Sequence, residues 1–153
     1  MLRMSKLTDY GTMVLAQLAA TEGSLATCSA VAEATRLGQP TVSKLLKLLA
    51  RAGLVVSERG VQGGYALARS ADAISAAEII DALEGPFAIT ECSAAAGTCD
   101  LESHCRVATA WQRINGSIRR SLESVSLADL QMQAEPLPPP DLKRALTKSA
   151  AAT

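Results

Sequence analysis

The sequence predicts a mainly α-helical fold that contains one small β-hairpin. Three observations predict it: apolar residues recur at helical spacing in several segments, glycines separate two short runs with the composition of strands, and a long amphipathic stretch follows. With 153 residues, of which 48% are hydrophobic, the chain has the size of one ordinary domain, or of a small domain with an added oligomerisation element.

Three helices are expected in the first third of the chain, over about residues 5–20, 28–35 and 40–52. The apolar stripe of the first helix consists of Leu7, Gly11, Val14, Leu15 and Leu18. The second helix is expected to turn Val31 and Ala34 inward, and a tight turn over residues 36–39 leads to the third. Pro40 suits the start of that third helix and Gly53 suits its end. Its buried face is expected to hold Val42, Leu45, Leu46 and Leu49.

A β-hairpin is expected next, because residues 54–59 and 65–68 have strand composition and flank Gly60, Gly63 and Gly64. Helix, turn, helix and hairpin follow one another in the order of a winged helix. A fourth helix is expected from Ser75 to the Gly85-Pro86 pair, which ends it. Its apolar residues are Ile74, Ala77, Ile79, Ile80 and Leu83.

A long amphipathic helix of about 18 residues, or roughly 27 Å, is expected after residue 105. Its apolar stripe consists of Val107, Trp111, Ile114, Ile118 and Leu122. A single chain has little left to bury this stripe against, which favours an oligomerisation element. A short capped helix over residues 126–130 and a polyproline stretch over 135–140 follow, with disorder expected beyond.

The charges are unevenly divided, although the formal net charge is zero. Residues 1–70 hold eight basic and four acidic residues, whereas residues 71–105 hold seven acidic residues and neither Lys nor Arg. A basic N-terminal half suits phosphates, and the acidic segment does not. The opening residues lack the apolar region of an export signal, and no apolar run approaches the ~20 residues of a membrane span. We therefore expect a cytoplasmic protein without a membrane partner.

The third helix and the hairpin are expected to bind double-stranded DNA. Lys44, Lys47 and Arg51 are spaced i, i+3 and i+7, so that they can face a phosphate backbone. Residues in the first turn of a recognition helix meet base edges, and a hairpin tip can reach a neighbouring groove. A solvated charged face is the alternative for one helix considered by itself, but the hairpin and the charge excess favour DNA. The predicted DNA-binding residues are Thr41, Ser43, Lys44, Lys47, Arg51, Arg59 and Gln62.

Three of the four cysteines, Cys92, Cys99 and Cys105, lie in a segment rich in Ala, Gly, Ser and acidic residues, with spacers of six and five residues. Thiols in the cytosol are kept reduced, which favours metal or redox chemistry over a disulfide framework. Thiolates suit iron–sulfur clusters, zinc or copper(I). A fourth ligand is open among His104, Glu91, Glu102 and a group from another chain, and an exposed loop residue is the alternative for His104. Cys28 is expected to be a small buried hydrophobe.

Over about residues 1–132 the sequence resembles the IscR and NsrR family of bacterial regulators. The resemblance rests on residues 40–46 and 53–55, on the wing segment 59–65, on the opening 5–10 and on the three cysteines. It implies a homodimer built on the long helix, and a [2Fe-2S] or [4Fe-4S] cluster on Cys92, Cys99 and Cys105. The opening and the wing look most like the subgroup that controls cluster-assembly (SUF) operons.

Two departures from this family bear on the fourth ligand. The first cysteine spacer has six residues where five are usual, and Ala108 stands where IscR has its histidine ligand. NsrR-like members use an aspartate from the first helix of the partner subunit, and Asp9 matches that position. The resemblance therefore implies Asp9 as fourth ligand, and a carboxylate that complements the helix dipole is the alternative.

The resemblance implies a transcriptional regulator that senses cluster status, or redox or nitrosative stress, and controls iron–sulfur assembly genes. A cluster-free regulator with a thiol switch or a zinc site is the alternative. A thiol enzyme with Cys105 as nucleophile and His104 as base lacks an orienting acid, so no enzyme is expected. The expected division is a DNA-binding domain over 1–70, a connecting helix over 71–90, a cluster-binding loop over 91–105, a dimerisation helix over 106–132 and a disordered tail over 133–153.

Overall fold

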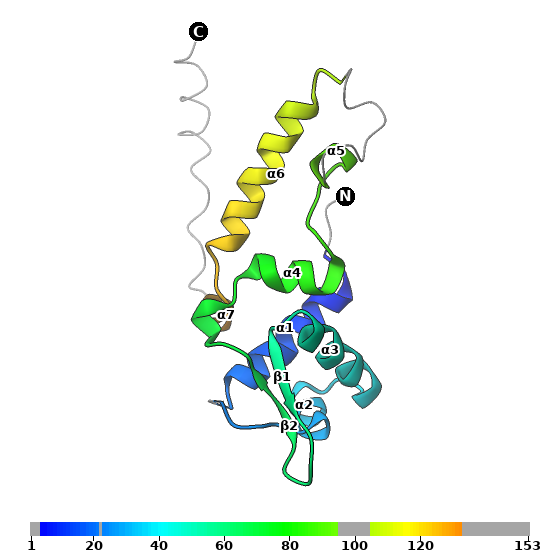
Figure 1. The fold of residues 1–153 in the computed structure, drawn as a ribbon, viewed down its shortest axis with the longest axis vertical. Coiled ribbons are helices and arrows are strands. Elements are labelled where there is room, and N and C mark those ends of the chain that lie inside the picture. Colours follow the sequence, from blue (N-terminus) through cyan, green and yellow to red (C-terminus); the bar gives the residue numbers. More distant parts are fainter. Residues whose placement is uncertain (1–3, 22, 95–104, 133–153) are drawn as a thin grey trace.

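The computed structural model describes residues 4–21, 23–94 and 105–132. The mainly helical fold with one hairpin is confirmed, whereas the expected tail over residues 133–153 lies outside the described residues. The elements, labelled in Figure 1, are α1 (Lys6–Ala19), α2 (Cys28–Thr35), α3 (Gln39–Arg51), β1 (Val55–Glu58), β2 (Gly64–Leu67), the 3-10 helix η1 (Ala71–Ala73), α4 (Ala76–Glu84), α5 (Glu91–Ala94), α6 (Ala108–Glu123) and α7 (Leu127–Gln131).

Residues with hydroxyl side chains form the N-caps of four helices. Ser5 accepts a hydrogen bond from the Leu7 amide at the start of α1, and Thr27 accepts one from the Ala30 amide at the start of α2. At α4 and α7 a serine N-cap forms a full capping box with the acidic residue three positions later. These bonds satisfy amides that have no partner within the helix, which is why the helices begin where they do.

The core lies where α1, α2, α3 and α4 meet behind the hairpin. The stripes expected on α1, α3 and α4 are buried there, apart from the half-buried Leu7. The prediction for α2 is half wrong, because Val31 is fully buried but Ala34 is exposed and Ala32 takes the second inward position. The face of α2 that points toward the core consists of Val31, Ala32 and Thr35. Helical geometry places Ala34 outside this face.

The hairpin pairs β1 with β2 antiparallel, from Val55 opposite Leu67 to Glu58 opposite Gly64. A third stretch of backbone joins it, because Ala26 and Tyr65 exchange two amide–carbonyl hydrogen bonds of 2.9 Å each. Gly64 makes this approach possible, since a Cβ at that position would lie 2.8 Å from the Ala26 carbonyl oxygen. The wing is thereby attached to the loop between α1 and α2.

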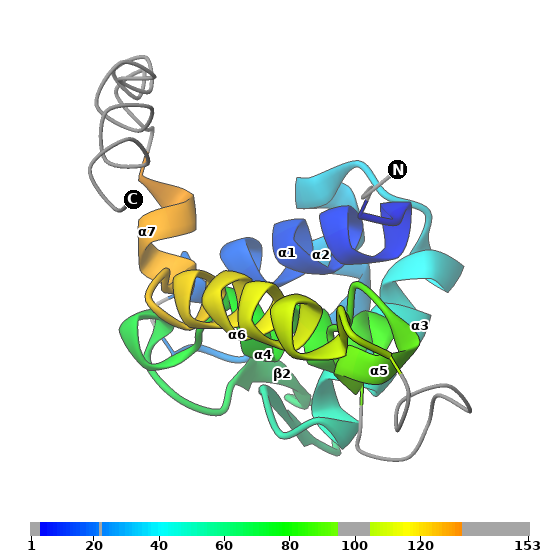
Figure 2. The same cartoon turned by 90° about the horizontal axis from the view of Figure 1, so that it is seen from above.

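The second half of the chain extends away from this body. α4 packs against α1 and α3 on one side and against α6 on the other, and α6 then rises beyond the winged helix (Figure 1). Seen from above, α6 passes across α4 with α5 beside it (Figure 2). The segment before α7 returns to the body through backbone hydrogen bonds from Ala76 to Val125 and from Leu127 to Ile74. None of the helices in the described ranges is long and apolar enough to cross a membrane.

Candidate nucleic-acid interface and cysteine segment

The two faces of α3 differ sharply in burial. Four apolar side chains are fully buried against α1, α2 and α4, and they fix the helix on the body: Val42, Leu45, Leu46 and Leu49. Lys44, Lys47 and Arg51 are exposed, while Thr41 and Ser43 near the start of the helix are half-buried. The three cations thus form an exposed basic row. The two hydroxyls lie near the start of α3, just after the turn that joins it to α2.

The turn before α3 is held by local backbone geometry. Arg36 ends α2 in the left-handed conformation with φ of 56°, which is uncommon for a residue other than glycine. Cys28 at the start of α2 lies with its Sγ 3.8 Å from the carbonyl oxygen of Gln39, the first residue of α3. Burial raises the pKa of this half-buried thiol, and the nearby Lys47 acts in the opposite direction. Cys28 therefore belongs to the contact between α2 and α3.

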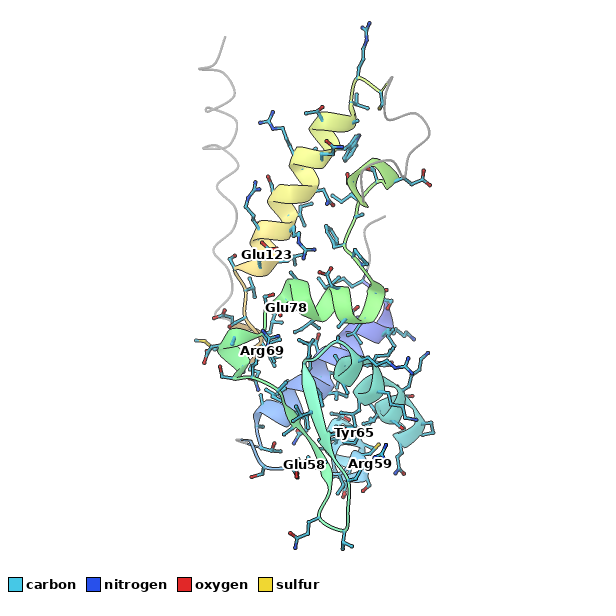
Figure 3. The ribbon with its side chains drawn as sticks, in the orientation of Figure 1. Glu58, Arg59, Tyr65, Arg69, Glu78 and Glu123 are labelled. Atoms are coloured by element: carbon cyan, nitrogen blue, oxygen red, sulfur yellow. The ribbon has the colours of Figure 1, made fainter. Side chains whose placement is uncertain are left out.

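The hairpin tip carries the remaining predicted DNA contacts. Arg59, Val61 and Gln62 are exposed there, and Figure 3 shows Glu58 and Arg59 on the hairpin below the helical body. Gly60 has φ of 123°, a backbone conformation that L side chains rarely adopt. All seven residues predicted to bind DNA lie on α3 or on this tip, five of them exposed and two half-buried.

The cysteine segment is not entirely a loop, because Glu91–Ala94 form the short helix α5 and place Cys92 within it. The side chain of Cys92 lies outside the described residues, as do Cys99, Glu102 and His104. Cys105 is a half-buried free thiol, and its carbonyl oxygen accepts a 3.5 Å hydrogen bond from the Ala108 amide at the start of α6. Within the described ranges, no three His, Cys, Asp or Glu side chains converge as a metal site would require. The convergence of the cysteines stays a prediction.

Asp9 is exposed in the first turn of α1, at the side of an open hollow of about 870 Å³. Residues of α1 and its N-terminal flank form one wall of the hollow, and Ile79, Ile80, Leu122 and Leu130 contribute apolar surface from α4, α6 and α7. The expected role of Asp9 as a ligand from a partner subunit depends on how two chains assemble, so it stays a prediction.

Two polar links join the C-terminal end of α4 to its neighbours. Glu84 accepts hydrogen bonds from the hydroxyls of Ser5 and Thr8, and these bonds lower the pKa of its carboxyl. Asp81 accepts two hydrogen bonds from Arg119 of α6, at 2.8 and 3.3 Å, which raise the pKa of the guanidinium. Neither link could be predicted from the sequence, because charges on an amphipathic helix look like ordinary solvated residues.

A third polar link involves Asn115 of α6, which is 8% exposed. Its Oδ1 accepts a 3.1 Å hydrogen bond from the Ile89 amide, and its Nδ2 donates a 3.4 Å hydrogen bond to the Ser93 carbonyl oxygen. This residue was not among the predicted site residues either. A signal was present, because Asn115 lies four residues after Trp111 and three before Ile118, on the apolar face of the helix.

Comparison with known proteins decides the family. Residues 4–133 match the Rrf2 family, described as "Iron-dependent Transcriptional regulator". The chain belongs to the Rrf2 family. Its members are transcriptional regulators rather than enzymes, and this Rrf2 chain is accordingly a DNA-binding transcriptional regulator with a winged helix.

Solved structures resemble the Rrf2 chain over most of its length. The global cysteine regulator CymR of B. subtilis is 31% identical, with a TM-score of 0.66 over 88% of this chain and 100% of that one. IscR of T. potens is 32% identical, with a TM-score of 0.63 over 88% of this chain and 89% of that one. CymR of Staphylococcus aureus is 30% identical, with a TM-score of 0.60 over 86% of this chain and 99% of that one. The predicted membership of this family of winged-helix regulators is confirmed, whereas the SUF subgroup stays a prediction.

Proposed function

We propose that this Rrf2 regulator is a cytoplasmic homodimer whose affinity for a DNA operator depends on an iron–sulfur cluster. The ligands are Cys92, Cys99 and Cys105, with Asp9 of the partner subunit as the fourth. One observation carries the proposal: a DNA-binding fold presents three thiols in a segment that has acidic residues but neither Lys nor Arg. By analogy with the SUF subgroup, the operators lie at iron–sulfur assembly genes.

The donor set suits such a cluster. Thiolates are the usual ligands of iron–sulfur clusters, and a carboxylate can complete a set of three. Cys105 is a free thiol, and α5, which contains Cys92, packs against the helix that begins just after Cys105. When bound, the cluster supplies a redox-active and labile group whose loss is the signal. The chain's own contribution is to hold α5 on α6 and α6 on α4.

DNA binding divides between the two parts of the winged helix. Lys44, Lys47 and Arg51 neutralise phosphates along the exposed row of α3, which sets affinity and its dependence on salt. Thr41 and Ser43 lie near the start of α3, where they can meet base edges in the major groove. Arg59 and Gln62 extend from the wing tip toward the adjacent groove.

Dimerisation accounts for apolar surface that one chain leaves open. Along α6, Val107, Trp111 and Ile114 are 56%, 39% and 44% exposed, although they belong to the apolar stripe of the helix. The hollow beside α1 offers further apolar wall on the same chain. A second copy that packs α6 against α6 and covers the hollow buries both surfaces, and it brings a cysteine segment near the Asp9 of its partner.

A cluster-free regulator is the second candidate, and the structural likeness to CymR favours it. One of the similar structures is an oxidised form of S. aureus CymR, 28% identical to this chain. In that candidate the three loop cysteines form a thiol redox switch or hold zinc, while the DNA-binding surface and the dimer stay the same.

Anaerobic purification followed by visible spectroscopy and iron and sulfide assays separates the two candidates. The wild type is expected to be coloured and to contain iron and sulfide, and Cys92→Ala, Cys99→Ala and Cys105→Ala each to lose both. Asp9→Ala is expected to keep colour but to lose its cluster faster in air. Cys28→Ala is the matched control and should behave like the wild type. A colourless wild type that contains zinc or no metal contradicts the cluster and leaves the second candidate.

A further inference from the structure

Buried polar side chains are rare in the part of the chain that the structure describes, where Thr8 and Asn115 are the two examples. Thr8 is explained by its hydrogen bond to Glu84. Asn115 lies in the middle of α6 and is followed by Gly116, and both residue types are poor helix formers. A buried amide at such a position is favoured only when it makes hydrogen bonds outside its own helix.

The partners of Asn115 lie on both sides of Cys92 in the sequence. The Ile89 amide donates to its Oδ1 three residues before Cys92, and the Ser93 carbonyl oxygen accepts from its Nδ2 one residue after it. The turn between these two contacts is closed internally, because the Ser93 amide bonds to the Thr90 carbonyl oxygen at 2.9 Å and their hydroxyls lie 2.7 Å apart. The whole turn is therefore held as a unit.

Helix α5 has four residues, and a single helical turn is not stable without outside contacts. Its position depends on α6, against which it packs. The amide of Asn115 supplies one hydrogen bond to α5, at Ser93, and one to Ile89 just before it. A carboxylate at position 115 could accept from Ile89 but could not donate to Ser93, and an apolar side chain could do neither.

We propose that Asn115 is a positioning residue, which fixes the backbone turn around Cys92 on α6 and thereby aligns that cysteine for its ligand role. The inference rests on the proposed function in that Cys92 is a ligand. Asn115 itself touches backbone atoms and needs no contact with the cluster. Its loss leaves all three thiols in the chain but lets the first of them move relative to α6.

The test compares the wild type with Asn115→Leu, Asn115→Asp and the control Ser117→Ala. Ser117 is exposed on the same helix, and its hydroxyl donates to the Arg113 carbonyl oxygen within that helix. Three measurements are made on the full chain. These are amide hydrogen exchange at Ile89 in reduced metal-free protein, the alkylation rate of Cys92 in the same protein, and the half-life in air of the visible absorption after anaerobic reconstitution.

Asn115→Leu is expected to speed exchange at Ile89 by about tenfold, because one hydrogen bond is lost at a half-buried site. Asn115→Asp should keep the Ile89 amide protected, since the acceptor remains. Both variants should alkylate faster at Cys92 and lose the absorption several-fold sooner, and Ser117→Ala should match the wild type throughout. Amides of α3 should stay protected in all variants, which separates a local release from general unfolding.

The outcomes distinguish this inference from the proposed function. If Asn115→Leu matches the wild type in exchange at Ile89 or in Cys92 alkylation, the positioning role is wrong even if the wild type holds a cluster. If the reconstituted variants keep their absorption as long as the wild type, the role is likewise overturned. If the wild type takes up no iron, the proposed function fails, and the exchange and alkylation results decide the role of Asn115 without it.

Discussion

Single residues on α3 fall into a buried set and an exposed basic set. The buried leucines and valine hold it to the body, whereas Lys44, Lys47 and Arg51 are left in solvent on the other face. Burying apolar area stabilises the fold, but exposed cations contribute little to stability. Mutations on the two faces should therefore change different measurements.

Lys47→Gln is expected to weaken DNA binding by about three- to tenfold at moderate salt without changing the unfolding midpoint. The slope of log affinity against log salt should fall by about 0.9, as for one lost phosphate contact. Fluorescence anisotropy titrations at several salt concentrations measure both quantities. Arg120→Gln removes one positive charge from α6 and serves as control, and an equal loss of affinity there would mean that net charge is responsible.

Glu84 gives the stability of the protein a pH-dependent part. The hydroxyls of Ser5 and Thr8 lower its pKa from the ordinary 4.5, so the folded state favours the ionised form. This contribution is present above the ordinary pKa and is lost as the pH falls through the lowered value. Glu84→Gln should destabilise the protein slightly at neutral pH and lose less stability on acidification. Urea unfolding at neutral pH and at an acidic pH measures the free energy of unfolding of both proteins. An equal loss of stability on acidification in wild type and variant would contradict this prediction.

At the scale of elements, the packing of α1 on α4 involves a glycine in α1. A Cβ at Gly11 would collide with the side chain of Leu83 on α4, which is 8% exposed. Alanine in a helix interior is otherwise about 1 kcal/mol more favourable than glycine. Packing against Leu83 and helix propensity therefore act in opposite directions at this position.

Gly11→Ala is expected to lower the free energy of unfolding by about 1 kcal/mol, because overpacking costs more than the propensity gained. In the background of Leu83→Ala, which removes the collision, the same change should stabilise the protein. Chemical denaturation of the four proteins in this double-mutant cycle gives the coupling. A stabilising effect in the wild-type background would show that Leu83 moves aside without cost.

Most helices could be predicted from the sequence because their apolar stripes and capping residues are local signals. Cys28–Thr35 matches the prediction residue for residue, and α1 and α4 match within one residue at each end. Helix α5 could not be predicted, since it has four residues and its Ser93 is bound by Asn115, which follows more than twenty positions later. The two backbone hydrogen bonds between Ala26 and Tyr65 join residues that lie still further apart in the sequence. Of the candidate site, the exposed basic face of α3 could be predicted from periodicity. The predicted convergence of the cysteines depends on residues outside any periodic pattern.

At the scale of the whole molecule, α6 leaves Trp111 and Ile114 exposed to solvent, and the proposed dimer would cover them. Trp111→Ser is expected to shift the chain from dimer toward monomer, because the proposed α6–α6 interface would lose its largest apolar side chain. Sedimentation equilibrium measures the shift. Val61→Ser is the control, since Val61 is fully exposed at the wing tip and should leave the dimer intact. A dimer of unchanged affinity in Trp111→Ser would contradict this interface.

The half-buried thiol at the start of α2 has a practical consequence for spectroscopy. Alkylating dyes and spin labels react with thiolates, and a raised pKa leaves few thiolates at Cys28 near neutral pH. Exposed cysteines introduced elsewhere, at the wing tip for example, should consequently accept a label before Cys28 does. Distances between labelled wings in the proposed dimer could then be measured without replacing Cys28.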